Sequence, residues 1–76
     1  MQKHMNPINS IEEAQEAIEA FNGRAEDFEL PISDELQDPS GMNMAIIVDS
    51  ILARGWEPNG FVQKAGYRVY IYKEME

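Results

Sequence analysis

The segment from Phe61 to Lys73 constrains the fold more than any other part of the chain. It contains two runs that are rich in aromatic and β-branched residues, 61–63 and 67–73, separated by Lys64-Ala65-Gly66. Such runs favour strands, and a connector with glycine in its third position is typical of a type I turn followed by a left-handed bulge. The sequence therefore predicts an antiparallel hairpin.

The turn decides which side chains share a face of this hairpin. A two-residue Ala65-Gly66 loop would need positive φ at alanine in a type I′ turn, so we expect the three-residue connector, which pairs Gln63 with Tyr67. One face then carries Phe61, Tyr67, Val69 and Ile71, and the other carries Val62, Arg68, Tyr70 and Tyr72. Pro58-Asn59-Gly60 predicts a separate turn before the hairpin, with Trp56 as a core anchor.

A first amphipathic helix is expected between Ser10 and Gly23. Ser10 and Glu13 have the spacing of a capping box, and glycine suits a left-handed helix end. At 100° per residue the apolar side chains fall on one side of the helix and the glutamates on the other. The apolar side carries Ile11, Ala14, Ile18 and Phe21, and the acidic side carries Glu12, Glu13, Glu16 and Glu19.

A second helix is expected to begin at Asp38-Pro39 and to end at Arg54, before Gly55. Aspartate at the N-cap and proline at the first helical position are a favourable pair, with Ser40 or Asn43 as later alternatives for the start. Met42 and Ile46 protrude from the polar side of this helix. We expect the segment 24–38 to cover them, since monomers seldom expose large apolar patches; the alternative is that they extend an interface.

Between the helices, Phe28, Leu30 and Ile32 alternate with polar residues or proline, which predicts a short strand. Pro31 has no N–H to donate, so the strand belongs at a sheet edge or in irregular extended chain. We predict a two-layer α+β domain over residues 10–76, in the order α-β-α-β-β. Both helices pack on one face of a small antiparallel sheet, and residues 1–9 form a flexible arm.

Charge is concentrated in one part of the sequence. Ten of the fourteen acidic residues lie between Glu12 and Asp38, where Arg24 is the one basic residue, and the net charge is −8. Such a field repels nucleic acid and anionic membrane and attracts basic protein surfaces. We expect the partner-binding residues to be Glu12, Glu13, Glu16, Glu19, Glu26, Asp27, Glu29, Asp34, Glu35 and Asp38.

The spacing of the helical glutamates suggests a specific partner class. From Glu12 to Glu19 is about 10.5 Å along a helix axis, so four charges average about one per 3.5 Å. One strand of B-form DNA carries a phosphate about every 3.4 Å of its axis. The size and charge are similar to those of small acidic inhibitors, including phage anti-restriction and anti-CRISPR proteins, although no motif is shared.

Two functional hypotheses follow. The first is a non-enzymatic inhibitor that occupies the basic nucleic-acid-binding surface of a larger protein as a nucleic-acid mimic. The alternative is that the acidic side of the first helix is only a solvated face that keeps a small protein soluble. The second is a self-associating accessory or regulatory domain that uses its tyrosine-bearing sheet face, namely Val62, Arg68, Tyr70 and Tyr72.

Other functional classes lack the residues that they need. The chain has no cysteine, no calcium-loop order among its carboxylates and no phosphate-loop glycine pattern. We therefore expect no metal, no cofactor, no catalytic residues and no direct nucleic-acid binding. The absence of a long apolar run and of a signal peptide predicts a soluble cytoplasmic protein that does not bind membranes, either a monomer or a homodimer.

Overall fold

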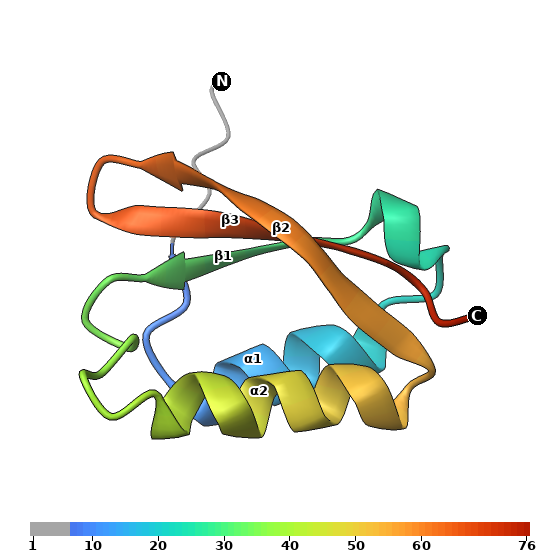
Figure 1. Ribbon diagram of the computed structural model, residues 1–76, viewed down its shortest axis with the longest axis horizontal. Coiled ribbons are helices and arrows are strands. Elements are labelled where there is room, and N and C mark those ends of the chain that lie inside the picture. Colours follow the sequence, from blue (N-terminus) through green and yellow to red (C-terminus); the bar gives the residue numbers. More distant parts are fainter. Residues whose placement is uncertain (1–6) are drawn as a thin grey trace.

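The chain forms two layers, a three-stranded antiparallel sheet and two α-helices on one of its faces (Figure 1). The computed structural model describes residues 7–76. In chain order the elements are α1 (Ile11–Ala20), the 3-10 helix η1 (Ala25–Asp27), β1 (Glu29–Ser33), α2 (Met42–Ala53), β2 (Trp56–Lys64) and β3 (Tyr67–Glu74). The predicted α+β class and the order α-β-α-β-β are confirmed, and η1 is an addition to that order.

α1 begins as predicted. The backbone N–H of Glu13 donates to Ser10 Oγ at 3.1 Å, and Ser10 Oγ lies 3.4 Å from Glu13 Oε1. The first bond is the serine half of the expected capping box, whereas the Glu13 carboxylate accepts from the Ser10 hydroxyl and not from the Ser10 backbone N–H. The helix buries Ala14 and Ile18 against the sheet layer and ends at Ala20.

α2 begins later than predicted, at Met42 with Gly41 as its N-cap. Gly41 has φ of +76°, which a residue with a side chain rarely adopts, so the chain turns sharply there and the helix cannot start at Asp38-Pro39. Asp38 still caps the helix from outside, because its Oδ1 accepts the backbone N–H of Asn43 at 3.2 Å. The helix ends at Ala53, and Gly55 follows with φ of +84°.

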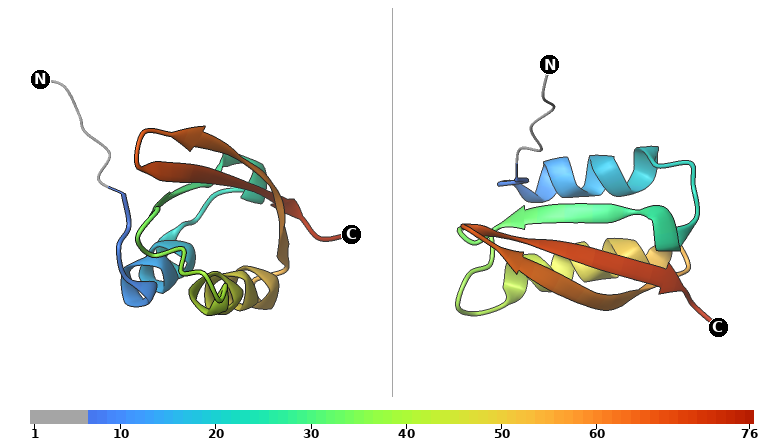
Figure 2. Two further views of the ribbon diagram at one scale, coloured as in Figure 1. Left: turned by 60° about the vertical axis from the view of Figure 1, so that its left-hand side comes forward. Right: turned by 90° about the horizontal axis from the view of Figure 1, so that it is seen from above.

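α1 and α2 lie side by side and run in the same direction (Figures 1 and 2). Gln15 Nε2 donates to Ser50 Oγ at 3.2 Å across the two helices. The guanidinium of Arg54 donates to the carbonyl oxygens of Ile18 and Phe21 at the end of α1. These contacts align the middle of α1 with the second half of α2 and satisfy carbonyl groups that have no partner within α1.

The strands lie in the order β1-β3-β2, so β3 is central and β1 is at an edge. The edge position of Pro31 agrees with its missing N–H donor. Ile8 lies beyond β1, where its N–H donates to Pro31 O at 2.8 Å and its carbonyl accepts from Ser33 N–H at 2.9 Å. Ile8 is also buried, so it belongs to the folded domain and not to the expected arm; residues 1–6 lie outside the described residues.

The hairpin turn differs from the prediction. Lys64 pairs with Tyr67, so the loop consists of two residues, Ala65 and Gly66. Gly66 has φ of +85° and Ala65 has negative φ, a combination that matches a type II turn and avoids the strain that type I′ would place on alanine. Pro58-Asn59-Gly60 is likewise no separate turn, because it lies inside β2 as a register irregularity between Pro58 and Phe61.

The one-residue change in register moves every β2 side chain to the opposite face relative to β3. Phe61 lies opposite Tyr70, and Val62 lies opposite Val69. Pairing with β1 then decides which face turns inward, because the buried Leu30 lies opposite Tyr70. The inner face, toward the helices, therefore carries Phe61, Arg68, Tyr70 and Tyr72, and the outer face carries Val62, Tyr67, Val69 and Ile71.

The core lies between the two layers. Its fully buried aliphatic side chains come from both helices and from β1: Ile18, Leu30, Ile32, Ile47 and Ile51. An aromatic group closes the end of the core near η1, where the Phe28 ring lies 5.3 Å from Trp56 and 5.7 Å from Tyr72 between centroids. Trp56 is 3% exposed, so its predicted role as a core anchor is confirmed.

Candidate functional site

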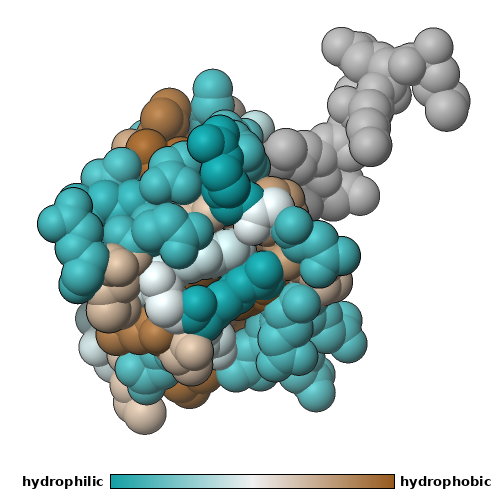
Figure 3. All heavy atoms as spheres, turned by 90° about the vertical axis from the view of Figure 1, so that its right-hand side faces the viewer, coloured by the Kyte–Doolittle hydropathy of each residue, from teal (hydrophilic) through white to brown (hydrophobic). Residues whose placement is uncertain are grey.

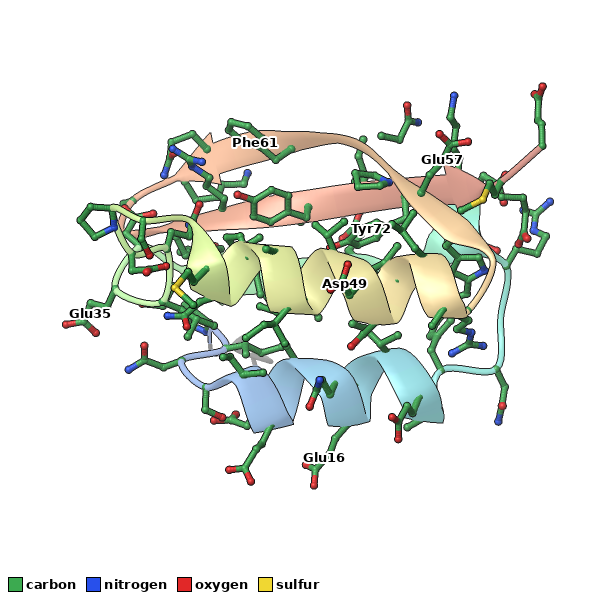
Figure 4. The ribbon with its side chains drawn as sticks, turned by 60° about the horizontal axis from the view of Figure 1, so that its bottom comes forward. Glu16, Glu35, Asp49, Glu57, Phe61 and Tyr72 are labelled. Carbon is green, nitrogen blue, oxygen red and sulfur yellow. The ribbon has the colours of Figure 1, made fainter. Side chains whose placement is uncertain are left out.

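The glutamates of α1 form an exposed acidic row along the helix. Glu12, Glu16 and Glu19 are all exposed, and Figure 4 shows Glu16 pointing away from α2 and the sheet. No hydrogen bond or ion pair within residues 7–76 holds these three side chains. They are therefore available to a partner along about 10.5 Å of helix axis, from seven steps of 1.5 Å.

Glu13 does not belong with these three. Its side chain lies at the N-terminal cap, within reach of Ser10 Oγ. Without it, three charges cover the same length with gaps of about 6 and 4.5 Å, which is wider than the roughly 3.4 Å repeat of one DNA strand. The row therefore carries its negative charges less densely than one DNA strand does, and its resemblance to a phosphate backbone is limited to a line of charges of the same sign.

Glu26, Asp27 and Glu29 lie at one end of the molecule, around η1 and the start of β1, at the right of Figure 1. Asp27 pairs with Arg24 at 3.2 Å, the single ion pair between side chains of residues 7–76. Glu26 Oε2 lies 3.5 Å from the backbone N of Glu74. Two of these carboxylates thus have local partners, and Figure 3, which faces this end, shows a mainly hydrophilic surface with small separate hydrophobic areas.

Asp34, Glu35 and Asp38 lie in the loop between β1 and α2, at the opposite end of the molecule (Figure 1). Asp34 Oδ1 accepts from the Gln37 amide at 3.4 Å, and Glu35 Oε1 accepts from Asn9 at 3.4 Å. The hydroxyl of Ser40 and the N–H of Asn43 both donate to Asp38. These bonds hold the pKa of Asp38 below its usual range, with the Ser40 bond as the larger cause.

The ten predicted acidic site residues thus occupy three places: α1, the η1 end and the loop before α2. The η1 end and the loop before α2 lie at opposite ends of the molecule (Figure 1). Side chains at the last two places mostly bond to neighbouring residues, whereas Glu12, Glu16 and Glu19 face solvent. This difference is invisible in the sequence, where all ten appear as a single acidic segment.

The residues of the predicted sheet-face site do not lie on one face of the sheet. Val62 lies on the outer side of the sheet, whereas Arg68, Tyr70 and Tyr72 lie on the inner side. Tyr72 is 3% exposed, and burial, followed by the nearby Tyr70, raises the pKa of its phenol. The Tyr70 hydroxyl donates to Gln37 Oε1 at 2.7 Å, so it also has an internal partner.

The outer face of the sheet is the side that remains open. It carries Val62, Tyr67, Val69 and Ile71, which line a shallow depression of about 310 Å³ together with Glu29 and Lys64. Val62 is 50% exposed. In the sequence, the alternation of Phe28, Leu30 and Ile32 indicates which side chains in and next to β1 are buried. Only the long-range pairing with β3 shows which β3 side chains share that buried face and which lie on the outer face.

The outward side of α2 is apolar. Met42 is 66% exposed and Ile46 is 39% exposed, so the expectation that residues 24–38 cover them is wrong. Residues 24–38 instead pass through η1 and β1, on the sheet side of the molecule. We call Met42, Ile46, Asp49 and Ala53 the α2 stripe, because their spacing of four, three and four residues places them on one side of the helix.

A shallow groove of about 310 Å³ runs between the two helices, lined by Ile18, Glu19, Ser50, Ala53 and Arg54. Glu19 therefore faces the groove from α1, and Ala53 of the α2 stripe faces it from α2. The Arg54 guanidinium lies 4.2 Å from the centre of the Trp56 ring and donates to two carbonyl oxygens of α1. The positive charge of Arg54 therefore already has partners within the domain, namely the Trp56 ring and the end of α1.

Comparison with known proteins adds no family to these observations. No family model matches the chain, and no curated protein or solved structure matches it either. Within residues 7–76, no group of three or more His, Cys, Asp and Glu side chains could hold a metal ion. In the same part of the chain, neither helix has the length and apolar character that crossing a membrane requires.

Proposed function

We propose that this protein is a non-enzymatic binding protein that occupies a basic surface of a larger protein. The observation that carries the proposal is the exposed row of Glu12, Glu16 and Glu19 on α1, which no cation of residues 7–76 contacts. Glu12 and Glu16 are like charges at i,i+4 and weaken the helix slightly. A basic partner would remove that repulsion.

The target class that fits best is a nucleic-acid-binding nuclease or effector. Such proteins have basic grooves whose field selects dense negative charge, and a chain of net charge −8 competes with phosphates for them. The cap at Ser10 and the link to α2 through Arg54 fix the backbone of α1, which carries the three glutamates, before binding. Pre-organisation of this kind reduces the entropy cost of association.

A pull-down with immobilised protein from an extract of the source cells tests the proposal. We expect retained proteins to elute as salt rises, because exposed charges are screened over about 8 Å at physiological ionic strength. We also expect a competing DNA duplex to displace them. The variant Glu12→Gln/Glu16→Gln/Glu19→Gln should retain them weakly at every salt concentration while its unfolding midpoint stays near that of the parent.

Two results would contradict the proposal: retention by the triple variant equal to that of the parent, or retained proteins that an excess of duplex does not displace. A matched control is Glu26→Gln/Asp34→Gln/Glu35→Gln, which removes the same number of charges from the two ends of the molecule. Equal losses in both triple variants would show that net charge matters and the α1 row does not.

The second candidate function is self-association, for which we now propose the outer face of the sheet as the contact surface. That face is apolar and nearly neutral, since Glu29 and Lys64 are its charged neighbours. Pairing places Lys64 opposite Tyr67 and Glu29 opposite Ile71, so the two charges lie at opposite corners. Sedimentation at two ionic strengths tests this candidate: a salt-insensitive dimer that Val69→Glu abolishes supports it, and a monomer at high concentration excludes it.

A further inference from the structure

We propose that the α2 stripe and the groove beside α1 form a docking site for one amphipathic helix of the partner, with an apolar face bordered by lysine or arginine. The inference rests on the proposed function in one respect, since it uses carboxylates of the same α1 row. It adds that the partner contributes an apolar surface and that this surface contacts α2.

The first observation is the exposure of large apolar side chains on α2. A helix that packs on a sheet normally presents polar residues to solvent. Here Met42 and Ile46 are 66% and 39% exposed, and Leu52, beside the stripe, is 42% exposed. The stripe is about 16 Å long, from eleven steps of 1.5 Å, and Asp49 is its one charged residue.

These side chains lie outside the buried core. The core-facing side of α2 already buries Ile47 and Ile51 completely. An exposed apolar strip without a partner costs hydration free energy and favours aggregation. Methionine also adapts its flexible side chain to irregular partner surfaces. The outward apolar side therefore points to contact with another molecule.

The second observation is the position of the α1 carboxylates relative to this stripe. Gln15 faces α2, because it donates to Ser50. On a helical wheel, Glu19 lies about 40° and Glu12 about 60° from Gln15, whereas Glu16 lies about 100° away. Glu19 lines the groove, and Figure 4 shows Glu16 pointing away from α2. Glu19 therefore borders the groove, and on the same wheel Glu12 points closer to the α2 side of α1 than Glu16 does.

Packed helices lie about 8–10 Å apart, so a basic side chain on a helix seated over α2 can reach the α1 carboxylates. The docking surface consequently presents an apolar strip with acidic residues along one side. The complementary occupant is a helix with an apolar face and lysine or arginine at its border, which is the helix-in-groove mode of recognition.

Charge excludes the other occupants. A second copy of this chain, laid on the same face, would bring Asp49 and the α1 glutamates toward their own equivalents, and each copy carries a net charge of −8. A nucleic acid or an anionic membrane is repelled for the same reason. A basic surface without apolar residues would leave Met42 and Ile46 exposed in the complex.

Two synthetic helices test the inference with the full chain. The first has leucine on one face and lysine on the other, and the second has the same lysines with serine in place of leucine. Binding is measured by anisotropy and by amide chemical-shift mapping at about 150 mM salt. We expect the leucine peptide to bind at least about tenfold more tightly than the serine peptide, with shifts along α1 and α2.

Three variants locate the contacts. Met42→Gln/Ile46→Gln should reduce the preference for leucine to less than about threefold and leave the serine peptide unchanged. Glu12→Gln/Glu19→Gln should weaken both peptides, and by more than Glu16→Gln/Glu35→Gln, which removes as many charges away from the groove. Val62→Gln, on the outer sheet face, should leave both affinities unchanged. Unfolding midpoints of all variants establish that each one is folded.

Equal affinities for the two peptides would overturn the inference, as would a leucine preference that survives Met42→Gln/Ile46→Gln or shifts confined to the outer sheet face. In those cases the proposed function still stands if the α1 glutamine variants weaken salt-dependent binding. If they change nothing while the leucine preference depends on Met42 and Ile46, the proposed function fails and a hydrophobic docking site remains.

Discussion

α1 and α2 lie on the same face of the same sheet, run in the same direction and bury similar aliphatic side chains, yet their outward sides differ. α1 presents Glu12, Glu16 and Glu19 to solvent, and α2 presents Met42 and Ile46. Packing constrains only the inward side of each helix. A charged outward side needs no partner because water stabilises it, whereas an apolar one gains nothing from water. This difference is the reason that the proposed docking site is centred on α2.

The two helices also begin differently. Ser10 caps α1 from the adjacent position, as the local sequence predicts. α2 has Gly41, which has no side chain, as its N-cap, and its first N–H groups donate to the side chains of Ser40 and Asp38 in the preceding loop. The α1 start thus depends on one serine at the N-cap, and the α2 start depends on two side chains that precede a glycine N-cap. Stability measurements can separate these contributions.

The largest expected effect on the free energy of unfolding comes from substitutions on the two sides of α2. Ile47→Ala removes a side chain with no exposed surface, so we expect the free energy of unfolding to fall by about 2–5 kcal/mol. Met42→Ala removes a side chain that is 66% exposed and should change it by no more than about 0.5 kcal/mol. Chemical denaturation measures both.

For a domain of this size the alanine variant of Ile47 could fail to fold, so Ile47→Val provides a graded version, with an expected loss of about 0.5–1.5 kcal/mol. If Met42→Ala proved as destabilising as Ile47→Val, Met42 would contribute to the core. The contrast between the inner and outer sides of α2 would then be wrong.

An intermediate effect is expected where the two helices are joined. Arg54→Ala removes the donors to the carbonyls of Ile18 and Phe21 and the contact with the Trp56 ring. We expect a loss of about 1–3 kcal/mol, as is typical of hydrogen bonds from a charged group. Amide exchange should speed up at the end of α1 more than at the start of α2.

Arg54→Lys serves as the control. Lysine keeps the charge but lacks the planar fork that reaches two carbonyl oxygens, so it should recover only part of the lost stability. Full recovery by lysine would mean that charge near the helix end, and not the paired hydrogen bonds, joins α1 to α2.

The smallest effect concerns the start of α2 at low pH. The pKa of Asp38 is lowered in the folded state, chiefly by the Ser40 hydroxyl and then by the Asn43 N–H. Its contribution is therefore complete above the unfolded value near 3.8 and is lost as pH falls through the lower folded pKa. Asp38→Asn keeps an acceptor without the charge, so its stability should depend less on pH below about 4.

Ser10→Ala provides the comparison for the start of α1, because the serine hydroxyl carries no charge that changes with pH. It should lower stability by about 1 kcal/mol at every pH and leave the acid dependence of the parent unchanged. An Asp38→Asn variant with the same acid dependence as the parent would show that the Asp38 cap does not form in solution.

Local sequence signals predicted the elements well where neighbouring residues decide the outcome. The serine cap at Ser10, the glycine stop at Gly55 and the edge position of Pro31 appear in the structure. The left-handed helix end expected at Gly23 does not, because α1 already ends at Ala20 and Gly23 has no positive φ. The three features that appear depend on backbone φ preferences and on donors within a few residues. The acidic row on α1 follows from helical periodicity for the same reason.

Predictions that needed a partner far along the chain were wrong, and so was one local prediction, the hairpin turn. The hairpin register changed by one residue because Ala65-Gly66 adopts a turn that places positive φ on Gly66 alone. The buried side of β3 was decided by pairing with β1, which the hairpin sequence does not contain. The exposure of Met42 and Ile46 depended on the path of residues 24–38 through η1 and β1.

The amino-acid sequence by itself determined that two helices and an antiparallel hairpin form, and that the negative charge precedes residue 39. Periodicity, caps and charge are local properties, so folding does not alter them. Only the tertiary structure decided which carboxylates remain free, which sheet face is open and that α2 exposes apolar side chains. Burial depends on which distant segments meet, and no local pattern specifies that.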